Sequence, residues 1–164
     1  MNSNTSSNQR ITFRKGHEND LPEMRRLFTE TIETTCRNDY DEKQRIAWKS
    51  GAENEERWLK VIKEQYVLVA VLHNKIVGFC TLDQRNYIDL LFIHKDHQQQ
   101  RIASTLYKQI EDKAIEQNSM SLAADVSKTA KPFFEKKGFH TLREQLVSVN
   151  NVHLTNYKMI KKLI

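Results

Sequence analysis

The residues best suited to chemistry lie in segment 88–111, IDLLFIHKDHQQQRIASTLYKQIE, where an apolar run enters a polar stretch and then a helical pattern. A strand that turns directly into a helix aims several free backbone N–H groups and the positive end of the helix dipole at one place. The small residues Ala103 and Ser104 would let a ligand approach the backbone there. The pattern suits an anion such as a pyrophosphate, although many strand–turn–helix units bind nothing.

Three ionisable side chains in or near this segment could hold or transfer protons. Asp89 lies in the predicted strand, on the same side as Leu91 and Ile93 if side chains alternate regularly. A carboxylate among apolar side chains can accept a proton as a general base, or it is simply a hydrogen-bonded or edge-paired aspartate. His94 after the strand is either functional or structural. Asp125, in a later strand, either holds a substrate amine or is solvated.

The elements that position these residues follow from hydrophobic periodicity. Alternating and β-branched runs predict strands over 10–15, 66–73, 76–83, 86–94, 121–127, 139–149 and 152–162. Helical spacing predicts a helix that begins near Asp20, helices over 41–49, 54–64 and about 100–117, and a short helix within TAKPFFEKK before Gly138. This order predicts an α/β (α+β) fold: a mixed central sheet of six to seven strands flanked by about four helices.

Composition limits the class of protein. Leu, Ile, Val and Phe make up about a quarter of the 164 residues, above the roughly one fifth below which chains are usually disordered. We expect a single folded domain, residues 10–164, behind an Asn/Ser/Thr-rich tail, residues 1–9, that is flexible. No apolar run approaches the roughly 18 residues that cross a membrane, and MNSNTSSNQ lacks the apolar region of a secretory signal. No membrane association is therefore expected.

Metal and nucleic-acid sites are not indicated. The six histidines are scattered, and the two cysteines, Cys36 and Cys80, form neither a disulfide framework nor a zinc-ligand set. Free thiols favour the cytoplasm. The net charge of +5 is spread from Arg10 to Lys162 without a long basic block, so the terminal KMIKKLI is predicted to be a solvated strand end.

Two segments together resemble the GNAT acetyltransferase superfamily. The first segment, LFIHKDHQQQRIASTLYKQIE, is similar to the acetyl-CoA motif of that superfamily. The motif consists of an apolar strand, the pattern His-Pro-Asp/Glu-x-Gln/Arg-x-x-Gly-x-Gly/Ala, and a helix. The residues that match it in register are His94, Asp96, Gln98, Ile102 and Ala103. AKPFFEKKGF, residues 130–139, is similar to the family's AxxFYExxGF segment. The resemblance covers about 10–162. TTCRNDYD…AW, NYIDLLFIH and LTNYKM are similar to a subgroup of small, mostly uncharacterised bacterial acetyltransferases.

The resemblance implies a GNAT-like acyl-CoA N-acyltransferase fold, in which the fourth and fifth strands diverge and hold the acetyl thioester of acetyl-CoA between them. The end of the fourth strand, Leu91, Phe92 and Ile93, would pair with the pantetheine arm, and the Ile93 N–H would stabilise the oxyanion. Backbone N–H groups would hold the pyrophosphate at Gln98, Gln99, Gln100, Arg101, Ile102, Ala103 and Ser104. Ser127 would face the pantetheine, and Phe133, Phe134 and Lys136 would lie beside the cofactor.

Two residues depart from the family pattern. Arg101 stands where the family usually has glycine; it can keep ordinary helical angles and meet a phosphate, or it can crowd the site. Phe134 stands where the family often has the tyrosine that protonates the departing thiolate. Because phenylalanine has no proton to give, another residue or water must supply it.

The resemblance also implies an acceptor pocket beside the break between the first helices. Its predicted substrate-binding residues are Phe28, Ile32, Tyr40, Trp48 and Asp125, although the helical spacing of Phe28 and Ile32 favours core positions for these two. An aromatic and acidic lining suits a cationic amine.

The sequence therefore predicts an acetyl-CoA-dependent N-acetyltransferase, with a primary amine of a small molecule or an exposed amino group as acceptor and direct transfer in a ternary complex. The alternative is a catalytically weakened acyl-CoA-binding or sensing module with the same fold, which Arg101 and Phe134 motivate. A nucleic-acid-binding protein rests on charge alone, without a recognised motif. A homodimer through the last strands is left open.

Overall fold

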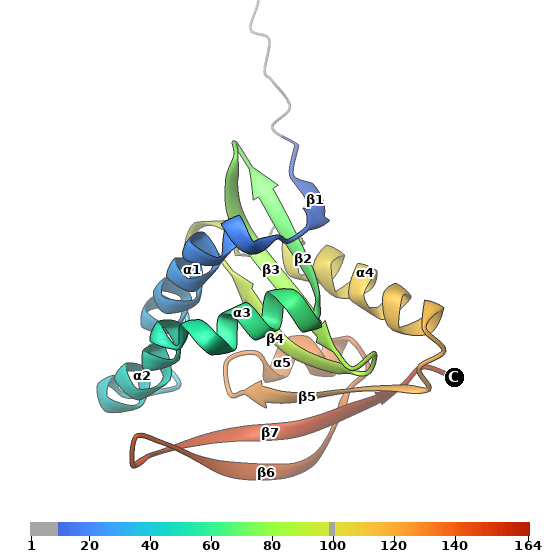
Figure 1. The fold of residues 1–164 in the computed structure, drawn as a ribbon. Helices are drawn as coiled ribbons and strands as arrows, with labels where there is room; N and C mark the ends of the chain where they lie inside the picture. Colours follow the sequence, from blue (N-terminus) through green and yellow to red (C-terminus); the bar gives the residue numbers. More distant parts are fainter. Residues whose placement is uncertain (1–9, 99–100) are drawn as a thin grey trace, which may run out of the picture.

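The described residues, 10–98 and 101–164 of a computed structural model, build a seven-stranded sheet in the order β1-β2-β3-β4-β5-β7-β6 (Figure 1). The predicted tail, 1–9, and Gln99 and Gln100 lie outside them. The strands are β1 (Thr12–Lys15), β2 (Tyr66–Leu72), β3 (Lys75–Asp83), β4 (Tyr87–Ile93), β5 (Ser121–Ser127), β6 (His140–Val149) and β7 (Val152–Lys162). All neighbouring pairs are antiparallel except β4 and β5, which are parallel.

Five α-helices occur among the described residues: α1 (Leu21–Thr34), α2 (Glu42–Lys49), α3 (Glu55–Glu64), α4 (Ile102–Glu116) and α5 (Lys131–Lys136). Each of the five was predicted from its helical spacing, although the fold class was given as about four helices, and the predicted mixed α/β fold is confirmed. No helix in the described part of the chain is long and apolar enough to span a membrane.

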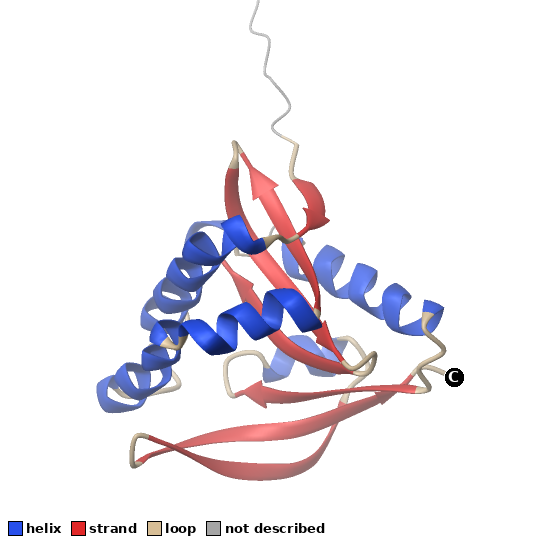
Figure 2. Ribbon diagram, viewed as in Figure 1, coloured by secondary structure: helices blue, strands red, loops and turns tan. Residues whose placement is uncertain are grey.

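The helices cover the two faces of the sheet separately (Figure 2). Helices α1 and α3 pack on one face, where their buried side chains meet residues of β2, β3 and β4, among them Phe79 and Phe92. Helix α4 packs on the other face against Ile93 and its neighbours, and α5 lies there beside β5. The apolar spacing of α1, with Met24, Leu27 and Phe28 buried, is what turns one side of that helix to the sheet.

Strand β4 contains a bulge that reverses the predicted direction of one side chain. Thr81 of β3 is opposite Leu90, but Leu82 is opposite Ile88, so Asp89 is an extra residue in β4. Asp89 therefore turns to the face of α3, where it meets Arg57, while Leu91 and Ile93 pack on the face of α4. Our prediction that Asp89 shares a side with Leu91 and Ile93 was wrong, because regular alternation fails at a bulge.

Strands β4 and β5 separate almost as soon as they pair. Only two positions of β4 pair with β5, Tyr87 with Ala123 and Ile88 with Ala124, whereas β5 pairs with β7 along its whole length. The bulge follows Ile88 directly. A bulge bends its strand and increases its twist, so it accounts for a divergence that begins there.

The divergence leaves one edge of β4 facing an opening. In an antiparallel ladder, residues alternately direct their N–H and C=O toward the partner strand and away from it. The His94 N–H donates to the Val77 carbonyl of β3 at 2.8 Å, which fixes the alternation along this end of β4. The backbone N–H groups of Leu91 and Ile93 therefore point away from β3, toward the opening.

Gly78 of β3 sets how closely α4 approaches the sheet. A Cβ atom at this position would lie 2.9 Å from Cδ1 of Ile93, 3.2 Å from Cγ2 of Ile102 and 3.3 Å from Cδ1 of Leu106. Two of these atoms belong to the first turns of α4. Because residue 78 has no side chain, the amino end of α4 can lie against β3 and beside the end of β4.

We predict that Gly78→Ala lowers the free energy of unfolding by about 1–3 kcal/mol, because the added methyl overpacks the interface between β3 and α4. Denaturant unfolding measures this change. Gly51→Ala is the matched control, since its Cβ would meet the Phe28 ring only at ordinary contact distances of 3.8 and 3.9 Å. An equal effect of both substitutions would contradict the proposed role of Gly78.

Candidate functional site

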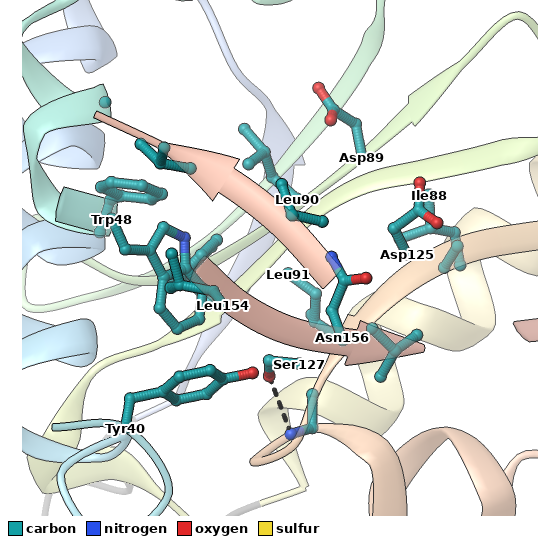
Figure 3. A pocket seen from close by; sticks show the side chains of 18 of the residues that line it. Tyr40, Trp48, Ile88, Asp89, Leu90, Leu91, Asp125, Ser127, Leu154 and Asn156 are labelled. Carbon is teal, nitrogen blue, oxygen red and sulfur yellow. Dashed lines mark hydrogen bonds between the residues drawn. The ribbon is translucent and has the colours of Figure 1, made fainter. Parts of the chain in front are cut away.

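A cavity of about 680 Å³ opens where β4 and β5 diverge (Figure 3). This volume is typical of sites for small molecules. Its walls come from α1, α2 and α3, from Ile88 to Phe92 of β4, from Ala124 to Ser127 of β5, and from β6 and β7 with their turn. Segments far apart in the sequence thus meet around one space.

Aromatic rings form much of the wall on the side of the first helices. Phe28 contacts both Trp58 and Phe92, with ring centroids 5.3 and 4.8 Å apart, and Trp48 lies 5.3 Å from Tyr40. All five residues line the cavity. Because the rings brace one another, this wall offers a preformed apolar surface to a ligand.

Four of the five predicted substrate-binding residues lie in the cavity wall: Phe28, Tyr40, Trp48 and Asp125. Ile32 does not. Its side chain is completely buried in the core between α1 and the sheet, so it is corrected to a core residue. The spacing that placed Ile32 on the same helical face as Phe28 could not distinguish the interior of that face from its end at the cavity.

Tyr40 joins three segments at the cavity. Its hydroxyl donates to the Thr155 carbonyl at 2.6 Å and accepts from the Lys128 N–H at 2.9 Å. Burial raises the pKa of Tyr40 to about 12, so the phenol is protonated at neutral pH. The ring therefore fixes the positions of β7 and of the segment after β5 as well as forming part of the wall.

Asp89 is held by a bidentate ion pair. Its carboxylate accepts from Nη1 and Nη2 of Arg57 at 3.2 and 3.1 Å, and from Nε2 of Gln65 at 2.8 Å. Arg57 and Asp89 both line the cavity. The charge of this carboxylate is balanced where it meets the cavity, and its two oxygens already accept three hydrogen bonds.

Asp125 is held differently, by neutral donors. Its carboxylate accepts from the Tyr87 hydroxyl at 2.7 Å and from Nε2 of Gln145 at 2.7 Å, and the same amide donates to Asn156 at 3.0 Å. Burial, and then the hydrogen bond to Asp125, raises the pKa of Tyr87, so its phenol remains a donor. Asp125 is thus positioned by side chains from β4, β6 and β7.

The amino end of α4 lies past the end of β4, as the strand–turn–helix pattern predicted. Arg101 precedes α4 with φ of +60° and ψ of +14°, the left-handed region that favours glycine. Of the two alternatives for Arg101, the one with ordinary helical angles does not hold. The arginine adopts a conformation that glycine reaches without cost, and glycine is the residue that the resemblance leads us to expect at this position. The first turn of α4 contains no acidic residue to repel an anion.

The end of β4 and the turn after it are fixed by side chains. The Ile93 carbonyl accepts from the Thr31 hydroxyl at 3.1 Å and from Nε2 of Gln98 at 2.7 Å. Gln98 thus ties the turn to the strand through its side chain. Leu91 lines the cavity, whereas Ile93 lies farther along β4 and does not. Of the two N–H groups that face the opening, the one of Leu91 is therefore nearer the cavity.

The remaining predicted cofactor residues within the described ranges lie on α4, β4, β5 and α5. Ile102, Ala103 and Ser104 form the first turn of α4. Phe92, Ser127 and Phe134 line the cavity, and the Ser127 hydroxyl accepts from the Ala130 N–H at 3.1 Å at the start of α5. Phe133 packs on Tyr107 of α4, and Lys136 is exposed on α5. Gln99 and Gln100 lie outside the described residues.

Sequence reasoning missed the residues that hold the two carboxylates: Arg57, Gln65, Tyr87, Gln145 and Asn156. Each comes from an element other than that of its aspartate, so no spacing could reveal the contact. The one available indication was that Tyr87 lies in the strand next to β5, where side-chain alternation allows it to reach a residue of β5 such as Asp125. Within the described ranges, no three His, Cys, Asp or Glu side chains are grouped to hold a metal ion.

Comparison with known proteins gives consistent matches over nearly the whole chain. The family model of the acetyltransferase (GNAT) domain matches residues 36–161. The uncharacterized N-acetyltransferase YafP of Escherichia coli K12 is 31% identical over 149 residues, which are 91% of this chain and 94% of that protein.

Solved structures agree with these matches. A GCN5-related N-acetyltransferase from Rhodopseudomonas palustris superposes with a TM-score of 0.89 and 31% identity, over 93% of this chain and 95% of that one. The PaiA N-acetyltransferase from Thermoplasma acidophilum, in complex with coenzyme A, superposes with a TM-score of 0.78 over 93% of this chain and 99% of that one. At 19% identity, the second match shows a shared fold.

We predict that Arg101→Gly raises the free energy of unfolding by about 1 kcal/mol, because glycine adopts left-handed angles without the cost that a Cβ atom imposes. Arg101→Ala is the control, since it removes the guanidinium but retains the Cβ atom. Denaturant unfolding should separate the two variants. Equal stabilities of Arg101→Gly and Arg101→Ala would show that the backbone is not strained here.

Proposed function

This chain belongs to the GNAT acetyltransferase family, and we propose that it moves the acetyl group of acetyl-CoA directly to a primary amine bound in the cavity. The observation that carries the proposal is that the open edge of β4 reaches the cavity, at Leu91. A thioester bound along that edge would therefore present its carbonyl to whatever the cavity holds.

The proposed cofactor site follows from the backbone groups at that edge. The N–H group of Ile93 would bind a carbonyl of the pantetheine arm in the way that a neighbouring strand would, which leaves the N–H group of Leu91 for the thioester. The free N–H groups in the first turn of α4 would bind the pyrophosphate, helped by the positive end of the helix dipole. Arg101 adds a positive charge at the same end.

The proposed chemistry needs few groups from the protein. The amine nitrogen attacks the thioester carbon, a C–N bond forms, the C–S bond breaks, and the nitrogen loses a proton. The Leu91 N–H would stabilise the oxyanion. This role was predicted for Ile93, but we favour Leu91 because it lines the cavity and Ile93 does not. No covalent enzyme intermediate is required.

The proton for the departing thiolate cannot come from Phe134, which is buried at the position of the family's tyrosine. The Ser127 hydroxyl lines the cavity and uses its oxygen to accept from Ala130, so its own proton is available for donation. The Tyr40 proton, in contrast, is donated to the Thr155 carbonyl. Ser127 or water is therefore the proposed proton source.

Other expectations remain proposals. Cys36 and Cys80 are buried free thiols, which supports a reducing compartment such as the cytoplasm. A homodimer through the exposed strand β6 also remains a prediction. The weakened acyl-CoA-binding module is the second candidate function, and Phe134 is the residue that favours it.

We predict that acetyl-CoA binds with micromolar affinity and that Arg101→Ala weakens this binding several-fold by removing a charge from the pyrophosphate end. Isothermal titration measures both. An amine panel with acetyl-CoA then tests transfer. Binding without transfer to any amine would favour the sensing module. Absence of acyl-CoA binding at millimolar concentration would overturn the proposed function.

Asp89 borders the cavity, so it remains the proposed general base, although its ion pair with Arg57 competes for that role. If Asp89 accepts the amine proton, Asp89→Asn should lower kcat about 100-fold or more and leave the affinity for acetyl-CoA unchanged. Arg57→Gln is the matched variant, because it breaks the same ion pair but keeps the carboxylate. A similar small loss in both variants would mean that the pair only positions α3 against β4.

A further inference from the structure

The three charged side chains of the cavity wall are Arg57, Asp89 and Asp125. Arg57 and Asp89 balance each other, whereas Asp125 forms no ion pair with any Lys, Arg or His among the described residues. The wall therefore has one excess negative charge, although the whole chain has a net charge of +5. This negatively charged cavity in a positively charged protein is complementary to a cationic ligand.

Asp125 is also held in place before any ligand binds. Tyr87 and Gln145 each donate to one of its oxygens, and Asn156 fixes the Gln145 amide in turn. Each carboxylate oxygen can accept a further hydrogen bond. A charged group that is exposed to the cavity and already ordered loses little entropy when it binds a cation.

The cation at Asp125 cannot be the nitrogen that reacts. An amine must be neutral to attack the thioester, and an adjacent carboxylate stabilises the protonated ammonium. Asp89 is already the proposed acceptor of the proton from the reacting nitrogen, and a second carboxylate beside the same nitrogen would hold it as an ammonium and slow the transfer. Asp125 is better suited to a second ammonium on the same acceptor.

The strand register gives a lower limit for the separation of the Leu91 and Asp125 backbones. Ile88 is opposite Ala124, so Asp125 follows that pair by one residue, and Leu91 lies beyond the bulge. Strand spacing and rise separate the Leu91 and Asp125 backbones by at least roughly 6 Å, and the divergence adds to this. In Figure 3, Asp125 and Ile88 lie toward one end of the cavity, with Leu91 and Ser127 nearer its middle.

We propose that the acceptor is an aliphatic diamine in which the neutral nitrogen attacks the thioester near Leu91 while the second nitrogen, as an ammonium, binds Asp125. This inference rests on the proposed function and adds the substrate class. The separation of the two groups suits a linker of four or five methylene groups. The aromatic wall near Trp48 would accept any apolar extension from the reacting end.

Two cations lie near enough in the sheet to oppose this binding. Lys158 of β7 is opposite Asp125, and Arg143 of β6 is opposite Lys158, so all three project from the same face. Neither forms an ion pair with Asp125 among the described residues. Their positive charge would reduce the attraction for an ammonium, so Lys158→Gln should strengthen diamine binding.

The test compares acceptors that differ by one amino group: putrescine with butylamine, and cadaverine with pentylamine. We expect kcat/KM to be roughly tenfold or more higher for each diamine, with the difference mainly in KM. Asp125→Asn should remove that preference, so that kcat/KM for each diamine falls to about the value for its monoamine. Asp125→Glu should restore part of it. Asp112→Asn, on the exposed side of α4, is the control and should behave as the unaltered protein.

Several outcomes would overturn the proposal. Equal kcat/KM for diamines and monoamines would do so, as would an equal loss for both acceptors in Asp125→Asn. A preference for phenethylamine that persists in Asp125→Asn would assign the cavity to an arylalkylamine instead. If the protein binds no acetyl-CoA, the proposed function itself fails, and this inference fails with it. Thermal unfolding of each variant shows whether any loss is one of folding.

Discussion

The separation of β4 from β5 after two paired positions is the constraint on which the rest of the site depends. A strand in the middle of a sheet normally satisfies its backbone on both edges, because an unpaired buried N–H or C=O is costly. Here one edge of β4 is left for a ligand to satisfy. The same divergence creates the cavity, since β5 turns away with β7 while β4 continues toward α4. Cofactor edge and acceptor cavity are thus two consequences of one irregularity in the sheet.

Local features hold that irregularity in place. The bulge at Asp89 bends β4, and the ion pair with Arg57 anchors the extra residue to α3. Gly78 lets α4 approach the sheet, which places the amino end of the helix past the end of β4. On the opposite side, Tyr40 links β7 to the segment after β5 through both of its hydrogen bonds. The polar contacts are few, but each joins elements that are distant in the sequence, so the cavity has a defined shape.

Much of the fold could be predicted because its signals are local. The strand at 121–127 and the helices near 41–49 and 54–64 agree with the structure to within a residue or so, since alternation, helical spacing and capping residues such as Asp41 are read from neighbouring positions. The misplaced side chains have non-local causes. Asp89 changes face because of a register shift against β3, and Arg101 takes left-handed angles immediately before α4, where its residue type predicts none. Ile32 and Phe28 look alike in sequence, and only the packing of α1 separates them. The two partners of Asp125 come from β4 and β6, and Asn156 of β7 holds one of them, which no motif could have identified.

The claim that the open edge of β4 binds the cofactor is tested most directly by amide hydrogen exchange at Leu91 and Ile93, measured with and without acetyl-CoA. Exchange slows when an amide gains a stable hydrogen-bond partner. The account predicts that acetyl-CoA slows exchange at both residues, and at Ile102, Ala103 and Ser104 in the first turn of α4. The amide of His94 already donates to Val77 and should change little. Unchanged exchange at Leu91 and Ile93 under saturating acetyl-CoA would contradict the account, whatever the affinity.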